Sequence, residues 1–229
     1  MLAIQTLVER LATVFAEGEN KLEAMRAREE YFERAGKVFD DDGDLFESRI
    51  AAFLEWYIIE RRFRDGPPPA LRVIAGTQPG ETADENAGAG AGQGQGTARF
   101  TDEERHAAVH LATSHRSLFE LSAMSPQRLE VDDLIGGGRF WISERRNAAG
   151  FEPGALFEAR LLWNGQAVVF GKTFLFHPPD ARELVLGLVD RAADARTPAD
   201  DLLFRLSRLY VRWHRLGHLG AAKIYSGDA

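Results

Sequence analysis

The sequence predicts an α+β fold, with N-terminal helices, a small antiparallel sheet or partly closed β-barrel, and C-terminal helices. Three observations predict it. Apolar residues recur at helical spacing near both ends of the chain. Short runs rich in β-branched and aromatic residues lie between residues 117 and 176. Between these parts, residues 76–98 (GTQPGETADENAGAGAGQGQGTA) hold almost no large apolar side chain.

The first 66 residues predict three helices. Ile4, Leu7, Leu11 and Phe15 follow one another at steps of three and four residues, which predicts an amphipathic helix that ends at Gly18. The charged segment after it predicts a second, more exposed helix that ends near Gly36. In a third helix, apolar side chains cover more than one face, which indicates a central place in the core until the GPPP sequence at 66–69 ends it.

The acidic stretch KVFDDDGD before the third helix has two interpretations. If Gly43 were the sixth residue of a calcium-binding loop, Val38 and Arg49 would fall where oxygen ligands are required. Alternatively, Asp44 and Glu47 form a variant of the capping box, in which side chains bind the free N–H groups of the first turn. The helix cap is the preferred interpretation, because the calcium loop lacks its essential ligands.

Composition predicts three sections. Residues 76–98 cannot bury enough apolar surface to offset the entropy of ordering, so they are expected to form a flexible Gly-rich linker or loop. They separate a helical section, 1–75, from a second section, 99–225. The second section is expected to contain a helix, a small β-barrel and two C-terminal helices.

The second section follows this order along the chain. Thr101 and Glu104 form a capping box before the first helix. Five predicted strands follow, SLFELSAM, QRLEVDDLI, RFWISERR, ALFEARLLW and QAVVFGKTFLF, separated by turn sequences such as GGG and WNGQ. Residues 177–194 and 197–218 return to helical spacing, with Thr197 as cap and Pro198 as the first helical residue of the last helix.

Four segments carry a resemblance to a known group of proteins: FLEWYIIERRFRDG, FTDEERHAAVHLATSHRSLFEL, LEVDDLIGGGRFWISERR and FEPGALFEARLL. Together they resemble a group of uncharacterised bacterial proteins, some of which carry a Cys-rich SEC-C zinc tail. The resemblance covers roughly residues 45 to 175. This chain has no cysteine, so the zinc tail is absent. The resemblance supports the architecture and implies no activity.

The sequence contains no converging catalytic set. Without cysteine there is no thiolate nucleophile and no Cys-bound zinc, and no GxSxG motif is present. The pairs His106/His110 and His214/His218 have metal-ligand spacing, but neither has the Glu of a zincin after its first His. The clustered acids Glu130, Asp132 and Asp133 are typical of the turn that follows them. We therefore predict no catalytic, cofactor-binding or metal-binding residues and a protein that is not an enzyme.

The last predicted helix has the most unusual charge pattern. Arg205, Arg208, Arg212 and Arg215 follow one face of it, in a protein of net charge -7. Such a stripe is either solvated, paired with the acidic N-terminal half, or a docking site for a protein partner or another anionic surface. Phe119, Phe140 and Trp141 are either core residues or, in a nucleic-acid-binding barrel, groups that stack on bases.

Three functions follow from these patterns. The leading hypothesis is a non-enzymatic protein-interaction module. The alternative, which the negative net charge does not favour, is a nucleic-acid-binding module that uses the small β-barrel and the arginine stripe. The third is a metal-dependent hydrolase that uses a His/Asp site. No apolar run approaches the roughly 20 residues of a membrane span, and the first residues lack a signal-peptide pattern, so a cytoplasmic location is expected.

Overall fold

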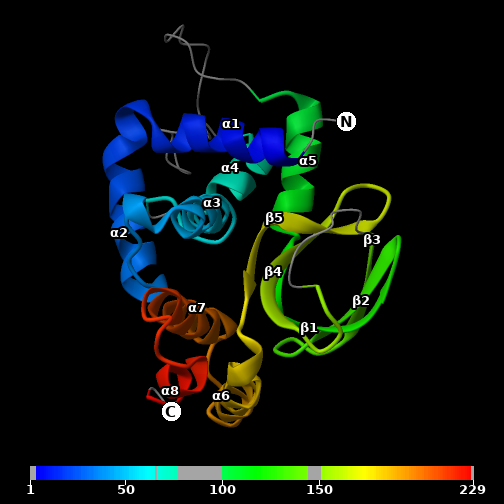
Figure 1. Cartoon of the computed structure of the whole chain (residues 1–229). Helices are drawn as coiled ribbons and strands as arrows, with labels where there is room; N and C mark the ends of the chain where they lie inside the picture. Colours follow the sequence, from blue (N-terminus) through cyan, green and yellow to red (C-terminus); the bar gives the residue numbers. More distant parts are fainter. Residues whose placement is uncertain (1–3, 65, 77–99, 144–150, 228–229) are drawn as a thin grey trace, which may run out of the picture. The chain divides into compact units, whose positions relative to one another are not determined.

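The chain divides into two compact units that do not follow sequence order. The computed structural model describes residues 4–64, 66–76, 100–143 and 151–227 (Figure 1). One unit comprises residues 1–30 and 49–114, and the other comprises residues 31–48 and 115–229. The predicted linker, 76–98, lies outside the described residues except for Gly76, which ends a helix in a left-handed conformation. These units therefore do not coincide with the sections 1–75 and 99–225.

The first unit is helical. Its elements are α1 (Ile4–Ala16), the 3₁₀ turn η1 (Gly18–Asn20), the first part of α2 (Lys21–Ala35), most of α3 (Asp44–Ile59), α4 (Pro69–Ala75) and α5 (Asp102–Ala112). Its core includes the fully buried Leu7, Leu11, Phe15, Tyr57 and Phe63. The capping box predicted from sequence is present, because Thr101 accepts from the N–H of Glu104 and Glu104 accepts from the N–H of Thr101.

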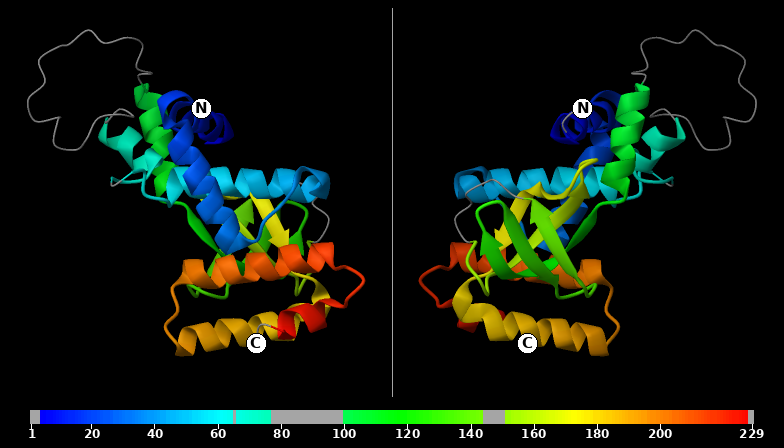
Figure 2. Two further views of the ribbon diagram at one scale, coloured as in Figure 1. Left: turned by 90° about the vertical axis from the view of Figure 1, so that its left-hand side faces the viewer. Right: turned by 90° about the vertical axis from the view of Figure 1, so that its right-hand side faces the viewer.

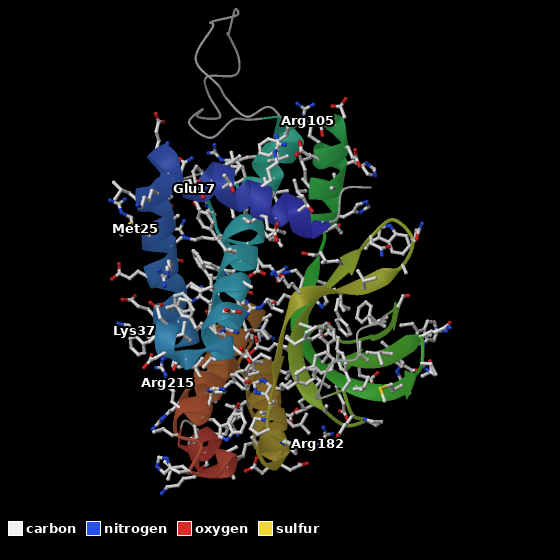
Figure 3. The ribbon with its side chains drawn as sticks, turned by 45° about the horizontal axis from the view of Figure 1, so that its top comes forward. Glu17, Met25, Lys37, Arg105, Arg182 and Arg215 are labelled. Atoms are coloured by element: carbon white, nitrogen blue, oxygen red, sulfur yellow. The ribbon has the colours of Figure 1, made fainter. Side chains whose placement is uncertain are left out.

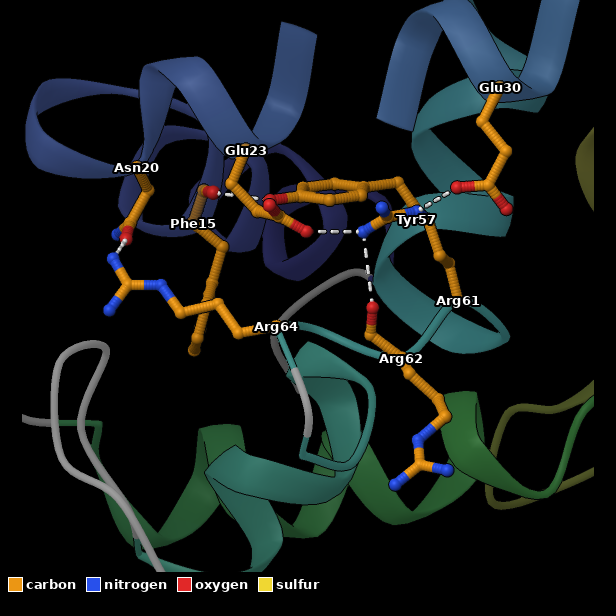
Figure 4. A network of polar contacts seen from close by, with 8 residues as sticks. All are labelled: Phe15, Asn20, Glu23, Glu30, Tyr57, Arg61, Arg62 and Arg64. Atoms are coloured by element: carbon orange, nitrogen blue, oxygen red, sulfur yellow. Dashed lines mark hydrogen bonds and ion pairs between the residues drawn. The ribbon is translucent and has the colours of Figure 1, made fainter. Parts of the chain in front are cut away.

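A polar network at the end of α3 joins this helix to α1, η1 and α2 (Figure 4). Arg61 donates to Glu23 at 2.6 Å and to Glu30 at 2.8 Å, so one guanidinium spans two turns of α2. Arg64 donates to Asn20 at 2.9 Å, and the buried hydroxyl of Tyr57 donates to the carbonyl of Phe15 at 2.7 Å. These contacts fix the direction in which the chain leaves α3.

The second unit is built on a five-stranded antiparallel sheet in the order β3-β2-β1-β4-β5. Its strands are β1 (His115–Ser125), β2 (Arg128–Asp133), β3 (Arg139–Ser143), β4 (Leu156–Trp163) and β5 (Val168–Phe176). Register shifts in β1 and in β4 mark bulges, which increase local twist. The sheet curls strongly (Figure 1), but β3 and β5 are not hydrogen-bonded neighbours, so it remains open rather than closing into a barrel.

Alternation along the strands gives the sheet two apolar faces. Phe119 and Phe157, paired between β1 and β4, lie in a Phe-rich cluster enclosed by the curl of the sheet. Leu118 and Leu156 point to the opposite face, where they pack against α6 (Arg182–Asp194), α7 (Ala199–Arg215) and α8 (Ala221–Ser226). Figure 2 shows α6, α7 and α8 gathered together beside the sheet. The α+β class predicted from sequence is thus confirmed, with α4 and α8 as additional short helices.

Residues 31–48 form a segment that packs against α7. The Tyr31 ring lies 5.5 Å from that of Phe204, and Arg34 pairs with Asp201 at 2.7 Å. Gly36 adopts φ +95°, and a Cβ atom at that position would meet Val211 at 3.2 Å. We call residues 31–48 the strap. It ends with the 3₁₀ turn η2 (Asp40–Asp42) and the first turn of α3.

Helix boundaries differ from the expectations at three places. Asp44 is the first residue of α3, and the carboxylate that accepts a backbone N–H before this helix is Asp42, bonded to Phe39 at 2.7 Å. The GPPP sequence follows the end of α3 and also begins α4, because proline is tolerated in a first helical turn. Pro198 occupies the cap position of α7, one residue after the predicted cap Thr197. Every helix within the described residues is too short or too polar to span a lipid bilayer.

Candidate functional site

A pocket of about 690 Å³ opens in the second unit, between the start of β4, the end of β5, the 3₁₀ turn η4 (Pro179–Ala181) and α7. Its size falls within the range of about 300–1,000 Å³ typical of ligand sites. Its apolar walls are Pro153, Leu156, Phe176, Pro178, Pro179 and Trp213. Its polar side chains include Glu152, Asp180 and Arg182.

Two rigid turns shape the walls. Gly154 has φ +87°, a conformation that glycine adopts without strain, and its N–H donates to the carbonyl of Leu121 at 2.8 Å. On the other side, Pro178 and Pro179 restrict the backbone where β5 passes into η4. Because prolines have little freedom to lose, these walls are ordered before any ligand arrives.

Arg182, at the start of α6 (Figure 3), joins the two sides. Its guanidinium donates to the carbonyl of Gly154 at 2.9 Å and to Glu120 at 3.0 Å. The positive charge is therefore matched by a carboxylate of this chain. Arg182 fixes the turn before β4 in place relative to α6.

Two carboxylates lie at the mouth of the pocket. Asp180 accepts the backbone N–H of Ala221 at 3.0 Å, and it thereby stabilises the first turn of α8. Glu152 is exposed in the turn that precedes β4. With Arg182 paired to Glu120, these two acids make the electrostatic field of the mouth negative.

A buried polar network lies behind the pocket. His177 follows β5 directly, and its ring bonds to the Tyr225 hydroxyl through Nδ1 at 2.9 Å. Its Nε2 lies 3.9 Å from Glu158, which accepts from Arg116 at 3.2 Å. Burial lowers the pKa of His177 to about 3 and raises the pKa of Tyr225. His177 is thus neutral at pH 7, and its fully buried side chain supports the pocket wall from behind.

Asp133 organises the turn between β2 and β3. It accepts from the N–H groups of Ile135 and Gly136, from Ser117 at 2.5 Å, and bonds His115 at 2.6 Å. Burial alone would raise the pKa of Asp133, but these hydrogen bonds outweigh it and hold the pKa below its usual range. The interpretation of this acidic cluster as a turn is confirmed for Asp133.

The arginine stripe of α7 lies partly against the strap. Arg215 donates to Asp42 at 2.5 Å and lies over the ring of Phe39 at 4.6 Å (Figure 3 shows it beside the segment that carries Lys37). Arg208 donates to the carbonyl of Arg34 at 2.9 Å, at the C-terminal end of α2, where a cation is favoured. Arg205 is half-buried, and Arg212 is exposed. Pairing within the chain therefore accounts for Arg208 and Arg215.

The three predicted stacking residues do not form one platform. Phe119 has no exposed surface and belongs to the Phe-rich core, so it offers no ring face to a base, which corrects that part of the stacking hypothesis. Phe140 is half-buried against the same core. Trp141 alone of the three is largely exposed (59%), with Arg128 over its ring at 4.3 Å and its indole N–H donating to Glu130.

The two histidine pairs meet different surroundings. His106 and His110 lie on α5 with ring centroids 5.2 Å apart. His214 is on α7, whereas His218 follows the end of that helix, so helical spacing does not place this second pair on one face. Within the described residues, no three His, Asp or Glu side chains gather closely enough to hold a metal ion.

Sequence reasoning missed the pocket and the network behind it. One signal was available: Glu158 and Arg160 occupy alternate positions in an otherwise apolar strand, FEARLL, and both are buried. Charged residues at buried positions require partners, so such a strand predicts a polar network. Its partners, His177 and Tyr225, come from distant parts of the chain and carry no local pattern.

The chain matches no protein family model, no curated protein and no solved structure.

Proposed function

We propose that this chain is a non-enzymatic protein-interaction module, and that the pocket beside Trp213 receives a side chain of its partner. The observation that carries the proposal is a preformed pocket with walls of proline, leucine and aromatic residues. Apolar walls of this kind suit an anchor side chain, since buried anchors supply most of the binding free energy in protein interfaces.

The polar groups around the pocket support binding rather than turnover. Arg182 is engaged by Glu120 and Gly154, and Asp180 is engaged by Ala221. Such contacts hold walls in position. A general base would have to reach a bound molecule within about 3 Å. The imidazole of His177 is enclosed by the protein, so it does not meet this condition at the pocket surface.

A nucleic-acid-binding module is the second candidate, and Trp141 with Arg128 is the observation that favours it. On the same face, however, Glu130 and Asp132 flank Trp141 and Arg139 in the strand register. Arg139 pairs with both carboxylates, at 2.8 Å and 2.6 Å, so its positive charge is already neutralised and this face offers phosphates little net attraction. Binding of labelled single-stranded RNA that weakens with salt and is lost on Trp141→Ala would establish this function in place of the first.

Photo-crosslinking in the native cell tests the leading proposal. A photoreactive amino acid at Pro179, in the pocket wall, is expected to trap a discrete protein partner. The same group at Asp190, exposed on α6 and outside the pocket lining, provides the matched control. Equal crosslinking at both positions, or crosslinking that persists when Pro153→Lys fills the mouth with a charged side chain, would contradict the proposal.

A further inference from the structure

We propose that the pocket takes one apolar side chain presented by a positively charged segment of a partner protein. This inference rests on the proposed function and adds the chemical class of the partner. It follows from two independent properties of the pocket, which are the composition of its walls and the charge at its mouth.

The walls select an apolar anchor. Leu156 belongs to the apolar cluster shared with α6, α7 and α8, and Trp213 packs against that cluster. Trp213 also lies 5.7 Å from the Tyr210 ring, so the indole is held in place. Pro153 and Pro179 are exposed at the opening, where an incoming aromatic or aliphatic side chain would cover them. Burial of this surface is favourable in proportion to the apolar area covered.

The mouth selects positive charge around the anchor. Glu152 and Asp180 are exposed lining residues. Glu183, outside the lining and 89% exposed, lies 4.0 Å from Arg182, so it already has a cation beside it. Within the described part of the chain, the lining contains two basic residues, His177, whose buried ring is neutral at pH 7, and Arg182, which already pairs with Glu120 at 3.0 Å. The net charge of -7 adds a general attraction for cations. Lysine or arginine residues on either side of the anchor would therefore find uncompensated carboxylates.

Designed peptides of known sequence can test the two properties separately. Three fluorescein-labelled nonapeptides are required: Phe flanked by four Lys on each side, Phe flanked by four Glu on each side, and Gly flanked by four Lys on each side. Fluorescence anisotropy with the full chain at about 0.15 M salt measures their dissociation constants. The lysine-flanked Phe peptide is expected to bind at least about tenfold more tightly than either of the other two.

Variants assign the binding to the pocket. Glu152→Lys is expected to weaken binding of the lysine-flanked Phe peptide about fivefold, the scale of one partly exposed charge pair. Asp190→Lys makes the same charge change on α6, away from the lining residues, and is expected to change binding less than twofold. Pro153→Lys is expected to weaken binding as Glu152→Lys does. Circular dichroism of each variant checks that the fold is retained.

The outcomes separate this inference from the proposed function. Equal binding of the lysine- and glutamate-flanked Phe peptides would overturn the charge preference. Equal binding of the Phe and Gly peptides would show surface attraction without an anchor, which also overturns it. If no peptide binds while crosslinks at Pro179 persist, the partner class is wrong and the interaction function stands. If both experiments are negative, both proposals fall.

Discussion

At the scale of single residues, the second unit is characterised by polar groups placed inside it. Arg116, Glu158 and His177 are fixed between the sheet and the C-terminal helices by contacts with one another and with Tyr225. Removing one partner of a buried polar pair lowers the stability of the fold by more than the pair itself contributes to it. The reason is that the remaining group stays buried without its hydrogen bond. These side chains therefore specify how the helices sit on the sheet.

Because burial lowers the pKa of His177, we expect the stability of the fold to depend on pH. Its pKa is about 3 in the fold and about 6.5 in an unfolded chain. Between these values the unfolded state binds more protons, so the free energy of unfolding falls as pH decreases below 6.5. From pH 7 to pH 5 this group alone removes about 2 kcal/mol, at about 1.4 kcal/mol per unit below 6.5.

Urea unfolding of the native chain and of His177→Gln at pH 7 and pH 5 measures this effect. The loss between the two pH values should be about 2 kcal/mol smaller in His177→Gln. His106→Gln, at an exposed position on α5, serves as the control and should keep the full loss. An equal loss in all three proteins would show that His177 is protonated without cost and is not held neutral by burial.

At the scale of elements, the strap and α7 are joined by close backbone approach and by charge. Arg34 pairs with Asp201, and Arg215 pairs with Asp42, so the contact is fixed near both ends of α7. The pKa of Asp42 is lowered, chiefly by its hydrogen bonds from Arg215. Burial opposes this effect and raises the pKa, whereas the hydrogen bond from the N–H of Phe39 lowers it further. Between the two ion pairs, Gly36 lets the chain pass directly over Val211.

Gly36→Ala tests this approach. Its φ of +95° strains any L side chain, and the added Cβ would come within 3.2 Å of Val211, so we expect a loss of about 2–3 kcal/mol in the free energy of unfolding. Gly18→Ala is the matched control, because Gly18 also has positive φ, +56°, but nothing lies within 4 Å of an added Cβ. The Gly18→Ala substitution should lower the free energy of unfolding by about 1 kcal/mol. Equal losses in urea unfolding would indicate that the strap does not approach α7 closely.

At the scale of the whole molecule, each of the two compact units is built from two separate segments of the chain. The strap lies between two segments of the first unit in sequence, yet it belongs to the second. Likewise, α5 follows the Gly-rich sequence but belongs to the first unit. A cut at the composition boundary would therefore separate residues that share a core.

A fragment comparison tests this organisation. Residues 115–229 alone would leave Phe204 and Asp201 without the strap contacts, so the fragment should unfold at a lower urea concentration and bind a hydrophobic dye more strongly than the full chain. Fusing residues 31–48 ahead of residue 115 through a Gly/Ser linker should recover most of the difference. A fragment that is as stable without the strap as with it would refute the assignment of residues 31–48 to the second unit.

Local patterns in the sequence predicted all the elements except the two short helices α4 and α8 and the 3₁₀ turns. Helical spacing predicted α1, α2, α3, α6 and α7, and the Thr101–Glu104 pair predicted the start of α5. Alternating β-rich runs and turn residues predicted all five strands. These features depend on neighbours within a few residues, and local patterns record them directly.

The sharing of a core between elements and the position of the pocket follow from contacts between segments that are distant in sequence. The stripe arginines Arg208 and Arg215 meet strap groups more than 170 positions away, and Phe119 faces inward because of the curl of the sheet. The pocket combines Glu152, Asp180 and Trp213, which no local spacing relates. Contacts between distant segments depend on how whole faces pack together, so they are fixed by the three-dimensional arrangement and leave no periodic signal in the chain.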